Sequence, residues 1–409
     1  MAYFEKNIAS TILKTIHARP EGTAIPVDAP RDASAIAAQS AKLRPAQFSD
    51  YSAVTELKRR WNLTADSFEN WERLWKRNPA LAGLASAPPI GWVLETQSKI
   101  VGYLGNISST YYFGDRKLSA VTSSGLVVEP AYRSVSLSLI AAFYRQPNVD
   151  IFLVTTAIPA VGKIARAFRS VRIPLEDYET VLFWVLRSYP FAKAVANRLG
   201  IPPALVPLSG GVGALAAIGE RFLRNRNPRM PETILDVTEM LVDQIGNEFQ
   251  SLWSNKLQEG PRLLADRTAS TLRWHYQIPG DTGTTTVLCC REREELRGYA
   301  VVRSGVSRRT GLRRALLADM LVRNDDPEVI RNLLVAAHDH ARQKGNDIFE
   351  VLGFPHNVRQ VCSEGKPYLR KYPACPFYYK AANATDHQAF SSDRVWYATP
   401  FDGDTTLMP

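Results

Sequence analysis

The stretch VVEPAYRSVSLS, residues 127–138, joins a strand to a helix and decides how the surrounding sequence is interpreted. Its two valines are typical of a strand, Pro130 ends that strand, and the residues after Arg133 predict a helix over 134–145. The first backbone N–H groups of such a helix point at the turn, and with the helix dipole they attract an anion. The small serines let a phosphate approach, and Arg133 adds a fixed charge. The stretch predicts a phosphate-binding turn, although an ordinary serine-capped helix start explains the same residues.

Outward from this stretch, periodicity predicts a mixed α/β unit. Alternating apolar residues upstream indicate an antiparallel meander of three strands, and the run DIFLVTTA downstream indicates a buried strand. The expected elements are a helix starting at Ser49 or Asp50, a helix starting at Asp66, strands at 91–96, 100–113 and 117–129, a helix at 134–145, a strand at 150–157, a helix at 160–168 and a strand at 179–186.

Part of this order recurs further along the chain. Gly102-Tyr103 is echoed by Gly298-Tyr299, a shift of 196 (298 − 102), and Asp150-Ile151-Phe152 by Asp347-Ile348-Phe349, a shift of 197 (347 − 150). A nearly constant shift predicts two copies of one domain. The expected units are a flexible arm at 1–42, a first domain at 43–186, a basic and apolar connector at 187–230 and a second domain at 231–409.

In this setting the stretch resembles the acetyl-CoA pyrophosphate loop of the GNAT N-acetyltransferase superfamily. There the fourth strand ends in V-x-P, and R/Q-x-x-G-x-G/A opens the next helix. Val128 and Pro130 match the strand end, and Arg133 matches the first loop position. Ser136 stands where the family prefers glycine, and Ser138 stands where it prefers glycine or alanine. The added Cβ and hydroxyl of each serine leave a phosphate less room to approach the backbone.

The resemblance covers residues 43–186 well and residues 232–382 through the repeat. It implies an α/β (mixed α+β) chain of two GNAT-like domains, each with a mixed central β-sheet flanked by helices. The second copy is expected to be degenerate, because the matching stretch Asp325-Asp326-Pro327-Glu328 is acidic and repels a pyrophosphate.

The resemblance also implies a site in a splay between the fourth and fifth strands, where the family binds acetyl-CoA or another acyl-CoA as co-substrate. The cofactor-binding residues implied are Leu126, Val127, Val128, Arg133, Ser134, Val135, Ser136, Leu137 and Ser138. Thr155, Thr156 and Ser123 are implied on the substrate side. The family's usual carboxylate inside the fourth strand is absent, which leaves Glu129, the nearest carboxylate, and Ser124 as catalytic candidates. No metal is expected.

Charge and composition limit the partners. Lys and Arg exceed Asp and Glu by 50 to 40, and the excess concentrates between Arg187 and Arg229 and again between Arg303 and Arg314. Ile201–Gly219 is uncharged but interrupted by Pro and Gly, so we expect a buried or membrane-surface helix and not a span. The four cysteines form no CxxC pair, and the N-terminus lacks a signal-peptide pattern. These features predict a cytoplasmic protein with, at most, weak peripheral contact with a membrane.

Three other features have plain structural interpretations. His275, between two aromatic residues, is expected to be packed and not catalytic. Asp402-Gly403-Asp404 is expected to be an ordinary turn, with a cation site as the less common alternative. The tryptophans Trp61, Trp71 and Trp75 are expected in the core.

Three functional hypotheses remain. The first is an acyl-CoA-dependent N-acyltransferase that acts on a small-molecule amine acceptor, such as a sugar or surface-polysaccharide precursor. The second is a Fem-type aminoacyl-tRNA-dependent transferase, which the arginine block at 303–314 favours; however, no helical-arm insertion is visible, and nucleic acid is not the expected partner. The third is a catalytically inactive tandem binding module. Binding of CoA separates the first hypothesis from the others, and the oligomeric state stays open.

Overall fold

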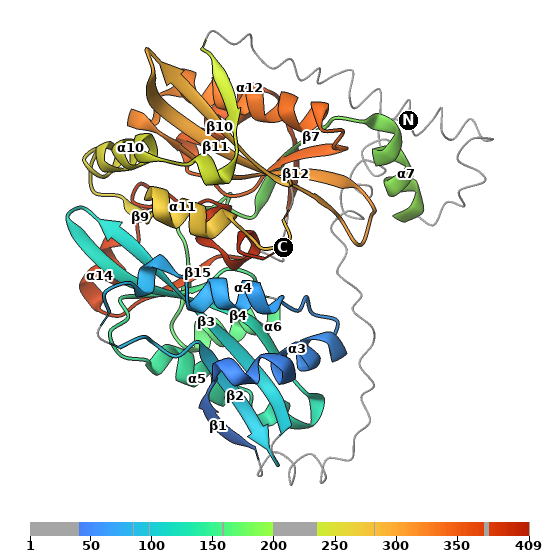
Figure 1. Ribbon diagram of the computed structural model, residues 1–409, viewed down its shortest axis with the longest axis vertical. Coiled ribbons are helices and arrows are strands. Elements are labelled where there is room, and N and C mark those ends of the chain that lie inside the picture. The colour runs from blue at the N-terminus through green and yellow to red at the C-terminus, as the bar shows by residue number, and fades with distance from the viewer. Residues whose placement is uncertain are drawn as a thin grey trace, which may run out of the picture.

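A computed structural model describes residues 41–198 and 235–408, apart from residues 85, 98, 158, 282 and 372–375. Two mixed β-sheets, each covered by helices, lie one above the other, and the C-terminal end of the described chain lies between them (Figure 1). The predicted arm, apart from its last two residues, and the run Ile201–Gly219 lie outside the described residues. Within the described ranges, no helix combines the length and the apolar character needed to cross a bilayer.

The first sheet is antiparallel except where β4 and β5 run parallel. Its strands, in spatial order, are β1 (Lys42–Pro45), β2 (Gly91–Thr96), β3 (Lys99–Phe113), β4 (Arg116–Val128), β5 (Ile151–Val154), β15 (Tyr378–Ala381) and β6 (Val171–Arg172), with β9 (Leu263–Ala265) paired to the end of β3.

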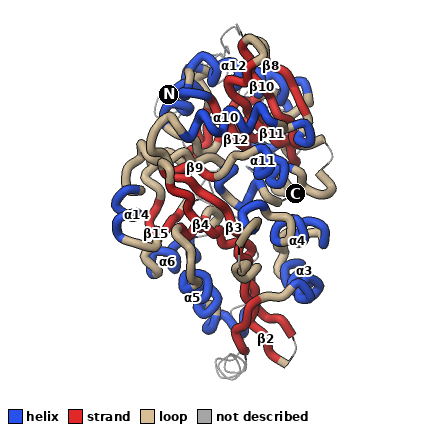
Figure 2. Tube along the Cα trace, turned by 60° about the vertical axis from the view of Figure 1, so that its left-hand side comes forward, coloured by secondary structure: helices blue, strands red, loops and turns tan. Residues whose placement is uncertain are grey.

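Successive side chains along each strand of this sheet point to opposite faces, so the sheet contributes to two hydrophobic cores, one on each face. Val93 and Tyr103 face α3 (Tyr51–Arg60) and α4 (Phe68–Trp75). Trp92 and Leu104 face α5 (Leu137–Arg145) and α6 (Pro159–Ala167). The two helix pairs therefore lie on opposite faces of the first sheet (Figure 2).

The second sheet repeats this plan. Its order is β8 (Val237–Met240), β10 (Thr285–Glu292), β11 (Glu295–Val306), β12 (Arg313–Val322), β13 (Ile348–Val351), β7 (Thr180–Val185) and β14 (Tyr368–Lys371), and β12 and β13 are its parallel pair. Helices α10 (Asn247–Leu257) and α11 (Ala269–Tyr276) pack on one face, and α12 (Pro327–Gln343) and α13 (His356–Glu364) on the other. Two mixed sheets flanked by helices confirm the predicted fold class. The remaining helices are α7 (Ser188–Arg198) and α14 (Ala384–Ala389).

Strands cross between the two halves in both directions, and β9, which pairs with β3, is one of them. Strand β7 follows β6 in the chain, yet it lies between β13 and β14 of the second sheet. Strand β15 follows β14 in the chain, yet it lies between β5 and β6 of the first sheet. The predicted strand at 179–186 exists, but it completes the second sheet and not the first. The two sheets are therefore joined by an exchange of strands as well as by packing.

Two predicted helix starts are wrong in detail. The N-cap of α4 is Ser67, whose side chain accepts a hydrogen bond from the Asn70 N–H, and Asp66 instead forms a buried ion pair with Lys58 at 2.8 Å. The predicted helix over 134–145 begins at Leu137, because a 3-10 helix, Pro130–Val135, occupies the turn after β4. The tighter turn follows from Pro130, which fixes the backbone at its first position.

Candidate functional site

The parallel strands β4 and β5 separate near the middle of the first sheet. Their pairing ends at Thr122 and Leu153. Just beyond this point β4 bulges: Ser124 pairs with Gly105 and Val127 with Tyr103, so the two intervening residues stand outside the ladder to β3. The first of them is Gly125, with φ of +66°, a conformation that favours glycine. The two strands therefore diverge where the bulge changes the direction of the β4 backbone, at the place where the resemblance implies a splay.

The chain near its C-terminal end packs against this splay. The Asp404 carboxylate accepts hydrogen bonds from the hydroxyls of Thr155 and Thr156, both at 3.1 Å, and from the hydroxyl of Ser124. The predicted catalytic residue Ser124 and the predicted substrate residues Thr155 and Thr156 thus meet on one carboxylate. Gly403 fits against Thr155 so closely that an added Cβ would lie 3.2 Å from its Oγ1.

Two arginines hold this segment in place. Arg303 donates hydrogen bonds to the carbonyl oxygens of Thr406 and Met408, at 2.9 and 3.1 Å. Arg73 of α4 donates to the carbonyl oxygen of Leu407 at 2.6 Å. Both halves of the molecule therefore fix the backbone that carries Asp404.

Asp404 is a buried carboxylate without a cation. It is 7% exposed, and no ion pair within the described part of the chain includes it. Burial raises the pKa of Asp404, because the charged form loses solvation that three hydroxyl donors only partly replace. A carboxyl group with a raised pKa accepts a proton more readily than a solvated carboxylate does.

An apolar cavity of about 310 Å³, counting its open mouth, lies on the α5 and α6 side of the splay. Leu126, Ser123 and Val154 line it from the strands, and Phe143, Tyr144 and Ala165 from the helices. Of the other predicted residues on β4, Val128 faces the same core, whereas Val127 faces α3 and α4. The structure therefore brings Leu126 and Ser123 to the cavity and turns Val127 away from it.

The predicted phosphate-binding turn leads into α5. Arg133 and Ser134 are exposed, and Leu137 is half exposed. The hydroxyls of Ser136 and Ser138 donate to the carbonyl oxygens of Arg133 and Val135, at 2.6 and 2.7 Å, so they are used within the turn. No side chain caps the start of α5. The N–H groups of Ser136 and Leu139 also donate within the turn, to the carbonyl oxygens of Arg133 and Ser136 at 3.1 and 3.2 Å. Arg133 and the other N–H groups at the start of α5 are the groups that face an anion.

Glu129 lies at the end of β4 in an ion-pair cluster. Its carboxylate binds Arg60 at 2.6 Å and Lys99 at 3.2 Å. It contributes no hydrogen bond to the group around Asp404. The charge of Glu129 is therefore paired at the edge of the sheet, whereas Asp404 lies where β4 and β5 separate.

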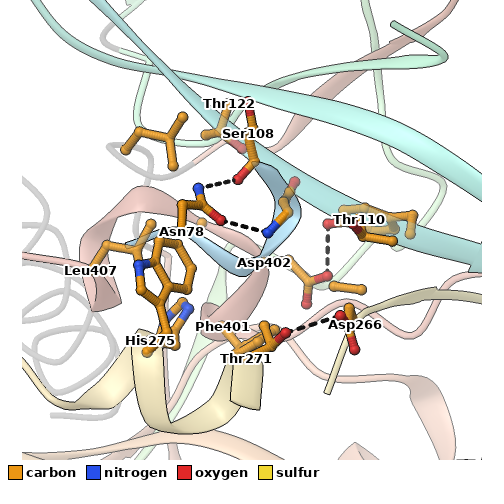
Figure 3. Close-up of a pocket in the computed structure, with 17 residues that line it drawn as sticks. Asn78, Ser108, Thr110, Thr122, Asp266, Thr271, His275, Phe401, Asp402 and Leu407 are labelled. Carbon is orange, nitrogen blue, oxygen red and sulfur yellow. Dashed lines mark hydrogen bonds between the residues drawn. The ribbon is translucent and has the colours of Figure 1, made fainter. Parts of the chain in front are cut away.

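A second pocket, of about 480 Å³ including its open mouth, lies between the two halves (Figure 3). The first half contributes Asn78, Ser109 and Thr122, and the second half contributes Asp266 and Trp274. Gly403, next to Asp404, also lines it. The pocket and the apolar cavity therefore approach the splay from opposite faces of the first sheet, and the segment that carries Asp404 lies at the pocket.

No protein-family model matches the sequence, and a search of curated protein sequences finds no significant match. Solved structures do match over most of the chain. A GCN5-related N-acetyltransferase from Anabaena variabilis aligns with a TM-score of 0.54 and 11% identity over 84% of this chain and 73% of that one. Saccharomyces cerevisiae N-myristoyltransferase, solved with bound myristoyl-CoA, aligns with a TM-score of 0.53 and 11% identity over 89% of this chain and 82% of that one. The chain has a tandem GNAT fold.

The two GNAT-fold halves differ at the start of the helix after their fourth strand. In the second half, the Asp326 side chain accepts hydrogen bonds from the N–H groups of Glu328 and Val329, at 2.9 and 3.5 Å. Asp326 thus occupies the position where an anion would bind α12, whereas the start of α5 carries no such cap. The sequence explains this contrast, because the carboxylate of an aspartate at the N-cap binds the first N–H groups of the helix in place of an external anion.

The second half also holds a carboxylate at its bulge. Asp319 pairs with Val301 as Ser124 pairs with Gly105, and 301 − 105 is the repeat shift of 196. Arg267 neutralises Asp319 through contacts of 3.0 to 3.2 Å, and both side chains are fully buried. The carboxylate at the bulge of the second GNAT-fold half is therefore held in a buried ion pair, whereas Asp404 at the first half's bulge is not.

Asp402-Gly403-Asp404 forms a turn as expected, where the 3-10 helices Pro400–Asp402 and Asp404–Thr406 meet, but this turn is buried. Both carboxylates are buried: Asp402 accepts hydrogen bonds from Tyr111 at 2.8 Å and from Arg267 at 3.2 Å, and Asp404 lies in the splay. His275 is packed as predicted, 2% exposed and stacked on Phe401, and burial holds its pKa well below 6.5. One feature of the sequence could have pointed to Asp404: it is one of two acidic residues within a largely apolar stretch near the C-terminal end.

Proposed function

We propose that the chain is an acyl-CoA-dependent N-acyltransferase in which Asp404 is the general base. The position of Asp404 carries this proposal. A buried carboxylate with a raised pKa, hydrogen-bonded by Ser124, Thr155 and Thr156, lies where β4 and β5 separate in a GNAT-fold half. This half also has an uncapped helix beside an exposed arginine.

The residues around the splay suit an acyl-CoA. The start of α5 and Arg133 present donors and positive charge to a pyrophosphate. The cavity lined by Leu126 and Phe143 is apolar enough for the chain between the pyrophosphate and the thioester. The co-substrate supplies an acyl group activated as a thioester. In support, one structure of similar fold was solved with bound myristoyl-CoA.

The bulge and Asp404 have different tasks in the reaction: the bulge stabilises the acyl oxygen, and Asp404 accepts a proton. The backbone at Gly125 and Leu126, outside the ladder to β3, provides N–H groups that stabilise negative charge on the acyl oxygen. Asp404 accepts a proton from the attacking amine as the N–C bond forms. The C–S bond breaks, the thiol leaves with a proton from solvent, and the amide product remains. Ser124, Thr155 and Thr156 orient the carboxylate throughout.

The acceptor that we propose is a small-molecule amine bound in the pocket of Figure 3. The tRNA-dependent alternative rests on the arginine block, but two of its members already bind within the protein. Arg303 holds the C-terminal segment, and Arg314 pairs with Glu350. Titration with tRNA at stated salt tests this alternative directly.

Thermal denaturation with acetyl-CoA and longer acyl-CoA tests the co-substrate. A ligand at one hundred times its Kd stabilises the folded state by about 2.7 kcal/mol, which raises the melting temperature. Arg133→Glu should weaken binding by about tenfold or more, because a charge-assisted contact contributes about 1.5 to 3 kcal/mol. Arg145→Glu, the same change at the exposed far end of α5, is the matched control and should bind like the parent.

A flat response of the parent protein to every acyl-CoA would reject this proposal and favour the inactive binding module. Equal affinity of the Arg133→Glu variant and the parent would reject the assignment of the pyrophosphate to α5, even if CoA binds elsewhere.

A further inference from the structure

We infer that the acceptor carries a second cationic group, and that Asp266 binds it at the end of the pocket away from Asp404. This inference rests on the proposed function, because it assumes that the pocket of Figure 3 holds the acceptor. It assigns a substrate class, small molecules with two or more amines, and a specificity residue.

Asp266 follows β9 and lines the pocket beside Thr110. Its N–H donates to the Thr110 carbonyl oxygen at 2.8 Å, which extends the pairing of β9 with β3. One carboxylate oxygen accepts from the Thr268 N–H at 2.8 Å, and the other accepts from the Thr271 hydroxyl at 2.9 Å. These contacts fix the direction of the carboxylate and leave each oxygen a free lone pair.

The charge of Asp266 is not balanced within the protein. No ion pair in the described ranges includes Asp266, although it lies in a pocket wall and is half buried. Asp402, which lines the same pocket, is instead bound to Arg267 at 3.2 Å. An uncompensated carboxylate in a pocket favours a cation and disfavours an anionic or neutral group in the same place.

Ser109 is a second sign that a polar ligand enters here. Its hydroxyl lines the pocket and is shielded from solvent, yet the described part of the chain offers it no hydrogen-bond partner. Buried hydroxyls almost always have a partner, which is a ligand or a water when the protein supplies none. Ser109 lies on β3 between Thr110, beside Asp266, and Ile107, which pairs with Thr122.

Strand β3 and the C-terminal segment both line this pocket. Asp266 lies beside Thr110 of β3, and Gly403, the residue before Asp404, lines the pocket as well. The pocket therefore suits a diamine or polyamine, with one amine at Asp266 and another toward the segment that carries Asp404.

Calorimetric titration of the full chain tests this with α,ω-diamines of increasing length, each compared with the amino alcohol of equal length. Affinity for the best diamine should exceed that of the matched amino alcohol by about tenfold or more. Asp266→Asn should remove this advantage and leave amino-alcohol binding unchanged. Asp115→Asn, an exposed residue of a hairpin turn, is the matched control.

Equal binding of diamines and amino alcohols by the parent would overturn the inference, as would an unchanged preference in Asp266→Asn. If this variant does not fold, the parent's preference for diamines over amino alcohols decides alone. The two failures are distinguishable. Acyl transfer to amino alcohols and diamines at equal rates would reject the role of Asp266 but leave the proposed transferase function standing. Absence of both CoA binding and acyl transfer would reject the proposed function itself.

Discussion

Asp404, which we propose as the general base, is far in sequence from the strands that surround it. Ser124, Thr155 and Thr156 were expected at the site because the resemblance placed the splay there, and the structure brings them together. Asp404 could not be predicted, because its partners lie about 250 residues earlier. Its role depends on the path of the C-terminal segment, and no local pattern encodes that path.

Replacement of Asp404 tests the base. With Asp404→Asn, acyl transfer should fall by about a hundredfold or more while acyl-CoA affinity is kept, because general-base catalysis contributes about 10² to 10⁴. In the parent, kcat/KM should rise with pH through the raised pKa of Asp404, and the variant should lose this dependence. Transfer by the variant at the parent's rate would exclude Asp404 as base.

The same variant has an effect on stability whose sign follows from linkage. The folded-state pKa of Asp404 is raised above its ordinary value of 3.8, so the folded protein binds this proton more tightly than the unfolded chain. The free energy of unfolding should therefore fall as pH rises from about 3.8 through the folded-state pKa. Asp404→Asn should remove that decline, as denaturant titrations across this range would show.

At the scale of elements, the sequence predicts strands better than helix starts. The meander strands match to within a residue, because alternation and turn residues mark both ends. Trp61 shows the limit for helices: it continues the apolar spacing of α3 but lies just past its end and is 39% exposed, whereas Trp71 and Trp75 are core. The bulge in β4 was also not predicted, although Gly125 was visible, because a glycine in a strand does not reveal its φ.

The bulge can be tested by substitution. Gly125→Ala places a Cβ 3.1 Å from Lys58 Cε at a φ of +66°, so it should cost about 1 to 2 kcal/mol and shift the backbone that faces the splay. Gly114→Ala is the matched control, with a φ of +59° and open space around the added carbon. Both should lower the melting temperature, and only Gly125→Ala should lower the rate of transfer. Equal rates for the two variants would contradict a role for the bulge.

At the scale of the whole molecule, the repeat predicts two similar sheets but not how they are connected. A shift of 196 or 197 residues relates β3 to β11 and β5 to β13, and the structure has both pairs in equivalent places. The exchange of β7 and β15 was not predictable. Strand β7 pairs with β13 as β15 pairs with β5, antiparallel in both cases, so the two strands occupy equivalent places in the two sheets. One core joins the halves, with Tyr111 and Ile151 of the first half against Phe249 and Leu272 of the second.

The exchange predicts that neither half folds alone. Fragments 41–198 and 235–408 each carry a strand that belongs in the other's sheet. Expressed separately, each should lack a cooperative unfolding transition, and mixed together they should form a one-to-one complex with native circular dichroism. A monomeric fragment that unfolds cooperatively by itself would contradict this.

The exchanged strands also set an order of events during protein synthesis. The first sheet lacks the strand between β5 and β6 until Tyr378–Ala381 has left the ribosome, about 200 residues after β6 itself. Meanwhile β5 and β6 present open edges, and such edges pair readily with other chains. The nascent first half therefore exposes these edges over that interval, and we expect chaperone dependence to track this delay.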